Sequence, residues 1–164
     1  MRFGNLLAAI LLTRQLKVLP SHHRIAGKSV GSYLFFVSVY LCFVASLFSG
    51  QKELFVIPLL VLSFSDVAAA LVGRSMGKRT IPGGKSWHGS PKILAGSAAF
   101  FITALPVLFF SFYYYLHWNL AASVFMTLLI TSISTTMEAY SPFGTDNFSV
   151  PFTVLIIIQI SFLF

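Results

Sequence analysis

Residues 54–73 read LFVIPLLVLSFSDVAAALVG, a run in which Asp66 is the only charged side chain. A helix needs about 20 predominantly apolar residues to cross the hydrocarbon core of a bilayer. This stretch therefore predicts a membrane-spanning helix. Further apolar runs lie on both sides of it, at residues 30–49, 93–116, 119–140 and 149–164. The last run is short for a span.

The composition of the whole chain also indicates a membrane protein. Of its 164 residues, 57% are hydrophobic and 9% are charged, and the mean hydropathy is +0.86. Soluble domains carry about 25% charged residues. We therefore expect an all-α integral membrane protein that forms one domain over residues 1–164. It would be a bundle of about five transmembrane helices, preceded by a basic segment at 1–29 with a short interfacial helix near residues 6–12.

The charges fall in short breaks between the apolar runs. Eleven Lys and Arg stand against four Asp and Glu, and most of the cations precede residue 30 or lie in the loop at 74–92. Such a distribution does not form the basic stripe of a nucleic-acid-binding surface. By the positive-inside rule, both basic segments and the turn at 140–149 face the cytoplasm. We expect the protein in the inner membrane of a cell or in an organelle membrane.

Asp66 is an ionisable residue inside a predicted span. It precedes Gly73 by seven residues, which places it about 10 Å from the expected helix end. Acidic residues within a membrane are costly and mark functional sites, so we expect Asp66 to point into the bundle. Simple hydrogen bonding to neighbouring helices is the alternative. Small or polar residues share its helix face and allow close approach of another backbone: Ser63, Ala69, Ala70 and Gly73.

Glu138 ends a polar stripe on the predicted helix at 119–140. The stripe consists of Thr127, Thr131, Ser134, Thr135 and Glu138. Their spacing places them on one helix face, which we expect to contact protein or water. Glu138 then either binds metal or substrate, or joins helices by hydrogen bonds at the membrane boundary.

The loop at residues 73–91 reads GRSMGKRTIPGGKSWHGSP and contains four cations and five glycines. Flexible backbone with Lys and Arg is suited to binding a polyphosphate, although a basic loop that only fixes topology would look similar. A Walker A site is excluded because Arg79 occupies a required glycine position. We expect Ser90 and Pro91 to begin the next helix as its N-cap and first residue. The helix N-terminus would then favour a bound phosphate.

Asp146 and Asn147 lie on the same predicted side of the membrane. Their oxygen atoms suit Mg²⁺, which usually binds one or two carboxylates together with substrate phosphates. Read alone, the pair equally indicates a turn or a helix start.

Three ordered motifs together resemble the polyprenol and phytol kinase family, over residues 24 to 155. This family includes dolichol and farnesol kinases and CTP-dependent diacylglycerol kinases, and it is distantly similar to phosphatidate cytidylyltransferases. The motifs are SDVAAALVGRSMGK at 65–78, KSWHGS at 85–90 and TDNFSVP at 145–151. The chain departs from the family pattern at three positions, with Ser65 in place of glycine, His88 in place of a glutamate found in some members, and Thr145 in place of aspartate. The additional N-terminal spans usual in the family are not seen.

The resemblance implies transfer of the γ-phosphate of a nucleoside triphosphate to a lipid alcohol, with CTP favoured over ATP. The implied catalytic residues are Asp66, Lys85, Glu138 and Asp146. The implied phosphate-binding residues are Arg74, Gly77, Lys78, Lys85, Ser86, Gly89 and Ser90. Asp66, Asp146 and Asn147 would hold Mg²⁺, or one of the acids would receive the alcohol proton.

Other functions remain open at this stage. Nucleotidyl transfer from CTP to phosphatidate uses similar parts, and a non-enzymatic transporter or assembly protein would also place acids within the bundle. The expected partners of the kinase are the nucleotide, the lipid alcohol and membrane lipid. A homodimer is one way to complete the lipid pocket.

Overall fold

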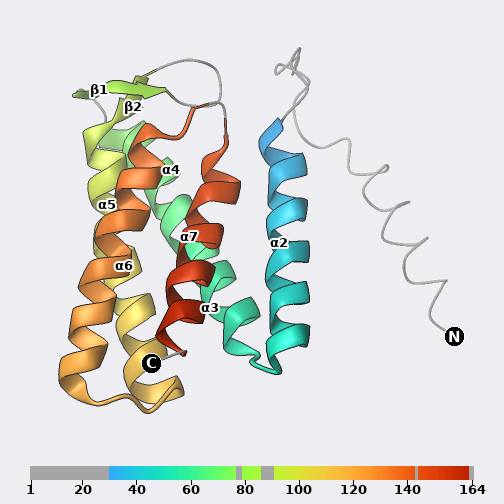
Figure 1. The fold of residues 1–164 in the computed structure, drawn as a ribbon. Coiled ribbons are helices and arrows are strands. Elements are labelled where there is room, and N and C mark those ends of the chain that lie inside the picture. Colours follow the sequence, from blue (N-terminus) through green and yellow to red (C-terminus); the bar gives the residue numbers. More distant parts are fainter. Residues whose placement is uncertain (1–29, 77–78, 86–90, 143, 163–164) are drawn as a thin grey trace, which may run out of the picture.

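The computed structural model describes residues 30–76, 79–85, 91–142 and 144–162. Helices make up most of this part of the chain and lie side by side in a bundle (Figure 1). They are α2 (Val30–Ser49), α3 (Glu53–Val61), α4 (Val67–Met76), α5 (Leu94–Phe110), α6 (Leu120–Tyr140) and α7 (Asp146–Ser161). The interfacial helix expected near residues 6–12 falls outside the described residues.

The helix lengths match the spans expected from the sequence. Four helical segments are long and apolar enough to cross a membrane: Val30–Ser49, Glu53–Met76, Leu94–Tyr115 and Leu120–Tyr140. The last helix, α7, is apolar but has only 16 residues. The prediction of a helical bundle with membrane-length helices is therefore confirmed for four of the expected spans, and the fifth is a shorter apolar helix.

A two-stranded antiparallel sheet covers one end of the bundle (Figure 1). It pairs β1 (Thr80–Lys85) with β2 (Pro91–Ile93). The expectation of a purely helical chain was wrong here, as was the assignment of Pro91 to the first residue of a helix. Ser90, the expected N-cap, lies outside the described residues. Pairing with β1 gives the backbone of β2 an alternative to helical bonds, and proline is tolerated at the first position of a strand. Helix α5 begins only at Leu94, whose amide donates to the Arg79 carbonyl at 3.0 Å.

Two π-helical turns interrupt the long helices, and each follows a proline. One of them, η1 (Leu62–Asp66), joins α3 to α4 and lies shortly after Pro58. The other, η2 (Ser111–Tyr115), continues α5 beyond Pro106. Proline lacks an amide hydrogen and its ring presses on the preceding turn, so the regular hydrogen-bond ladder is disturbed nearby. Because η1 ends at Asp66, this acid sits where the helix is locally widened.

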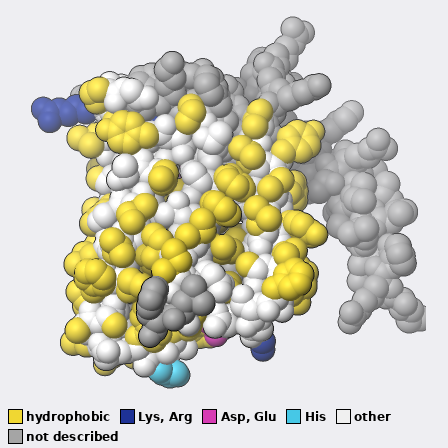
Figure 2. All heavy atoms as spheres, in the orientation of Figure 1, with side chains coloured by type: hydrophobic (Ala, Val, Ile, Leu, Met, Phe, Trp, Pro, Cys, Tyr) yellow, Lys and Arg dark blue, Asp and Glu magenta, His cyan; other side chains and the backbone are white. Residues whose placement is uncertain are grey.

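The core of the bundle is apolar and is shared by α3, α5, α6 and α7. Its fully buried members include Leu54, Ile57, Val61, Phe100, Leu108, Ile130, Val154 and Ile158. The outer surface is apolar as well, and hydrophobic side chains cover the face seen in Figure 2. Apolar side chains both inside and outside are typical of a bundle that packs against lipid.

Helices α4 and α5 approach each other closely at Gly73 and Gly96. A Cβ atom added to Gly96 would lie 2.9 Å from the Ala69 carbonyl oxygen, whereas one added to Gly73 would lie 3.6 Å from the Gly96 Cα. Ala69 and Gly73 belong to the predicted small-residue face and are buried, but Ser63 and Ala70 of that face are exposed. Ser63 lies within η1, where the helical periodicity that predicted the face is broken.

We predict that Gly96→Ala destabilises the bundle and that Gly73→Ala does not. The alanine at 96 must push the α4 backbone away, and overpacking of this kind costs about 1–3 kcal/mol. The alanine at 73 meets only an ordinary contact and gains helix propensity. Thermal unfolding of both variants in detergent measures the difference. Equal midpoints for the two variants would show that the close contact is not formed.

Candidate functional site

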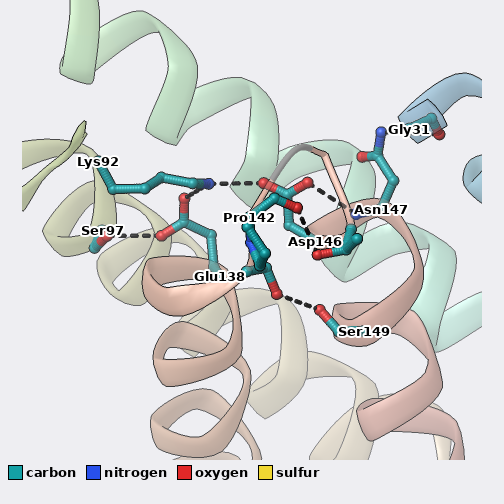
Figure 3. A network of polar contacts seen from close by, with 10 residues as sticks. Gly31, Lys92, Ser97, Glu138, Pro142, Asp146, Asn147 and Ser149 are labelled. Atoms are coloured by element: carbon teal, nitrogen blue, oxygen red, sulfur yellow. Dashed lines mark hydrogen bonds and ion pairs between the residues drawn. The ribbon is translucent and has the colours of Figure 1, made fainter. Parts of the chain in front are cut away.

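Lys92 joins three elements at the sheet end of the bundle. Its side chain leaves β2 just before α5, and its Nζ lies 2.5 Å from Glu138 Oε1 and 2.7 Å from Asp146 Oδ2 (Figure 3). Glu138 comes from the last turn of α6 and Asp146 from the first turn of α7. The three side chains are only 13%, 5% and 12% exposed. The two ion pairs therefore lie largely out of contact with solvent.

The remaining carboxylate oxygens of this network also have partners. Ser97 Oγ donates to Glu138 Oε2 at 2.6 Å, and the backbone N–H of Asn147 donates to Asp146 Oδ1 at 3.0 Å. A buried carboxylate is stable only when it is paired and hydrogen-bonded. We call Lys92, Ser97, Glu138 and Asp146 the charge network. Each of its two carboxylates is satisfied on both oxygens.

The charge network keeps Lys92 protonated. Burial alone would lower the pKa of the Lys92 ammonium, but the charges of Asp146 and Glu138 and its hydrogen bonds to them outweigh burial. The pKa of Lys92 is therefore raised from the ordinary value of 10.5. Stability gained from a raised pKa is fully present below the ordinary value and is lost as the pH rises through the raised one.

Asp66 lies beside this network but is not part of it. Its charge interacts with those of Asp146, Lys92 and Glu138. It is half-buried at the end of η1, and within the described residues no hydrogen bond or ion pair holds its carboxylate. Among the described residues, three carboxylates against one ammonium leave two negative charges in this region. The charges of the three predicted acids thus interact, and Asp66 is the one whose carboxylate has no hydrogen-bond or ion-pair partner among these residues.

Asn147, expected to bind metal, is turned toward α2 (Figure 3). The side-chain Nδ2 of Asn147 donates to the Gly31 carbonyl at 3.3 Å. The backbone carbonyl of Asn147 accepts from Ser38 Oγ at 2.7 Å. Both contacts fasten α7 to α2. The Asn147 side chain therefore does not join the three carboxylates, although its backbone amide orients Asp146.

The basic residues expected to bind phosphate are only partly described. Arg74 is exposed near the end of α4, at the same end of the bundle as the sheet. Lys85 ends β1, and its side chain falls outside the description. Gly77, Lys78, Ser86, Gly89 and Ser90 lie outside the described residues. Their phosphate-binding role stays a prediction.

The described side chains can be compared with those that Mg²⁺ prefers as ligands. Among the described residues, no group of three or more His, Cys, Asp or Glu side chains could hold a metal ion. Mg²⁺ does not need such a cage, because it usually binds one or two carboxylates, water and substrate phosphates. The carboxylate of Asp66, which has no hydrogen bond among the described residues and whose charge interacts with that of Asp146, is a donor of the type that suits such an ion.

Sequence reasoning missed Lys92 and Ser97 as site residues. Lys92 was counted only among the cations that set topology. One signal pointed to it, since Glu138 and Asp146 were predicted on the same membrane face and Lys92 directly precedes a span on that face. Buried acids on apolar helices require a nearby cation. Ser97 gave no signal beyond its place on the following helix.

Comparison with known proteins gives no match: no protein-family model, no curated protein and no solved structure is significantly similar to the chain.

We predict that Lys92→Met strongly destabilises the bundle. It leaves two carboxylates buried without a counter-charge, and breaking a buried ion pair in this way costs about 3–5 kcal/mol. Thermal unfolding in detergent is the measurement. Lys52→Met is the matched control because Lys52 is exposed at the opposite end of the bundle. Adding Glu138→Gln to Lys92→Met should restore part of the lost stability, because it removes one of the two unpaired buried charges.

The pH dependence provides a second control for the same variant. The stability difference between the wild type and Lys92→Met should stay constant from neutral pH to about pH 10 and narrow only above it, because the raised pKa keeps Lys92 charged. A stability difference that narrows already below pH 9 would contradict the charge network. So would an unfolding midpoint of Lys92→Met equal to that of Lys52→Met.

Proposed function

We propose that the chain is a membrane-bound lipid kinase that transfers the γ-phosphate of a nucleotide, CTP in preference to ATP, to a lipid alcohol. The acceptor is an isoprenoid alcohol such as phytol, farnesol or a polyprenol, or a similar alcohol such as diacylglycerol. The observation that carries the proposal is the free carboxylate of Asp66 next to the charge network, at the basic end of an apolar bundle. The three motifs that resemble the polyprenol kinase family supply the reaction type.

The location of these residues suits a reaction between a water-soluble substrate and a lipid substrate. A nucleotide reaches the sheet end of the bundle from water, where Arg74 and Arg79 are exposed. A lipid alcohol reaches the same end from the bilayer, along the apolar outer surface of the helices. By the positive-inside rule this end faces the cytoplasm, where nucleoside triphosphates are available.

Phosphoryl transfer depends mainly on positioning and on neutralising charge. We assign the phosphates to Arg74, Lys78 and Lys85, with amides of the segment from Ser86 to Ser90 as further donors. Asp66 would hold Mg²⁺, with Asp146 beside it. When bound there, Mg²⁺ would supply neutralisation of the phosphate charge. Asn147 is not required as a ligand, because its side chain binds Gly31.

Each acid of the charge network then has a definite task. Glu138 and Asp146 share Lys92 as their counter-ion, so its one positive charge cancels half of their combined negative charge. The charge on Asp66 has no such partner among the described residues and repels a bare nucleotide. The site therefore favours a nucleotide that carries a divalent cation.

We predict that the protein, in liposomes with Mg²⁺, transfers label from γ-labelled CTP to one class of lipid alcohol. The panel contains phytol, farnesol, geranylgeraniol, a long polyprenol and diacylglycerol, and γ-labelled ATP is run in parallel. Asp66→Asn should lower the rate about 10²- to 10³-fold, the loss typical of catalytic charge stabilisation. The unfolding midpoint should not fall, since Asp66 loses no hydrogen bond to any described residue.

Glu53→Gln is the matched control, because it removes one negative charge at the other end of the bundle. It should retain full activity. Failure to label any alcohol by the folded protein would contradict the kinase assignment. Formation of a CDP-lipid from α-labelled CTP and phosphatidate would contradict it as well, and would identify a nucleotidyltransferase.

A further inference from the structure

Helix α6 carries hydroxyl groups on two faces, and the two faces differ in hydrogen bonding. On the outer face, Ser132 Oγ donates to the Leu128 carbonyl at 2.7 Å and Thr136 Oγ1 donates to the Ser132 carbonyl at 2.8 Å. Both residues are exposed on the bundle surface. Bonding to the carbonyl four residues earlier is the usual solution for a hydroxyl that faces lipid, where no water is present.

The hydroxyls on the inner face of α6 have no such bond. Thr127, Thr131 and Ser134 are 4%, 0% and 0% exposed, and their hydroxyl oxygens have no partner among the described residues. The half-buried Thr135 has a buried hydroxyl oxygen that is equally unpaired. These residues lie on the same helix as Ser132 and Thr136 and are of the same types. Their hydroxyls nevertheless do not use the helix's own carbonyls.

Unpaired hydroxyls inside an apolar bundle are costly. Nearly all buried polar groups in proteins have a partner, and where the protein offers none the partner is usually an ordered water. Alanine or valine would fill the same positions without the cost. Several buried hydroxyls on one face, each without a partner among the described residues, therefore point to a bound polar ligand.

The spacing of the hydroxyls fits water. Residues four apart on a helix have Cβ atoms about 5–6 Å apart, and one water accepting and donating hydrogen bonds of about 2.8 Å spans a similar distance. Thr127, Thr131, Ser134 and Glu138 follow one another at intervals of four, three and four residues. Residues at these spacings are neighbours on one helix face. The buried Ser65, which directly precedes Asp66, is also unpaired.

We propose that the inner face of α6 binds a file of ordered water molecules that ends at Glu138. Its ligand is water, held by Thr127, Thr131, Ser134 and Thr135. It would give Glu138 a further hydrogen bond beside those from Lys92 and Ser97, which helps to keep a carboxylate ionised on a membrane-length helix. This site is separate from the proposed kinase reaction and does not depend on it.

Solid-state NMR of the full chain in lipid bilayers tests this site through transfer of magnetisation from water to threonine Cβ signals. The chain supplies its own references, because Thr80 is exposed at the sheet and Thr136 bonds to its own helix. The Thr127 and Thr131 signals, assigned with Thr→Val variants, should build up nearly as fast as that of Thr80. Build-up as slow as that of Thr136 would overturn the proposal.

Thermal unfolding gives an independent result. Loss of a bound water should lower the unfolding midpoint of Thr131→Val below those of the wild type and Thr136→Val. A higher midpoint for Thr131→Val would show that its hydroxyl is unpaired in a dry core, and would also overturn the proposal.

Discussion

One buried ammonium group determines how the sheet end of this bundle is arranged. Lys92 pairs with both Glu138 of α6 and Asp146 of α7, and its backbone belongs to the strand that precedes α5. Neither buried carboxylate would be stable without this ammonium group. The ends of α5, α6 and α7 are therefore held in one place by a single set of contacts. The close approach of Gly73 to Gly96 then holds α4 against α5, and this brings Asp66 beside the charge network.

The sequence was sufficient for the helices and for part of the site. Hydrophobic run length predicted the membrane-length helices to within a few residues, because burial in lipid imposes that length. The spacing of Thr127, Thr131, Ser134 and Glu138 predicted a polar face, and these residues are buried. The small sheet was not predictable, because Pro91–Ile93 is too short to show alternation. Lys92 and Asn147 were misread because their roles depend on contacts more than 40 residues away in sequence.

The three acids at the sheet end of the bundle differ in their contacts. Glu138 and Asp146 have every carboxylate oxygen occupied by Lys92, Ser97 or a backbone amide. The carboxylate of Asp66 has no such partner among the described residues, and it adds to an excess of negative charge. Exposed arginines lie at the same end of the bundle. In the proposed kinase, such a region would favour a phosphate ligand that brings a cation, which is the form in which nucleotides reach kinases.

The most direct test of this account is equilibrium binding of CTP to the purified protein, with and without Mg²⁺, for the wild type and for Asp66→Asn. The account predicts binding to the wild type that requires Mg²⁺, and its loss in a variant that unfolds at the same temperature. Binding that is independent of Mg²⁺, or equal in the two proteins, would show that Asp66 does not recruit a metal–nucleotide complex.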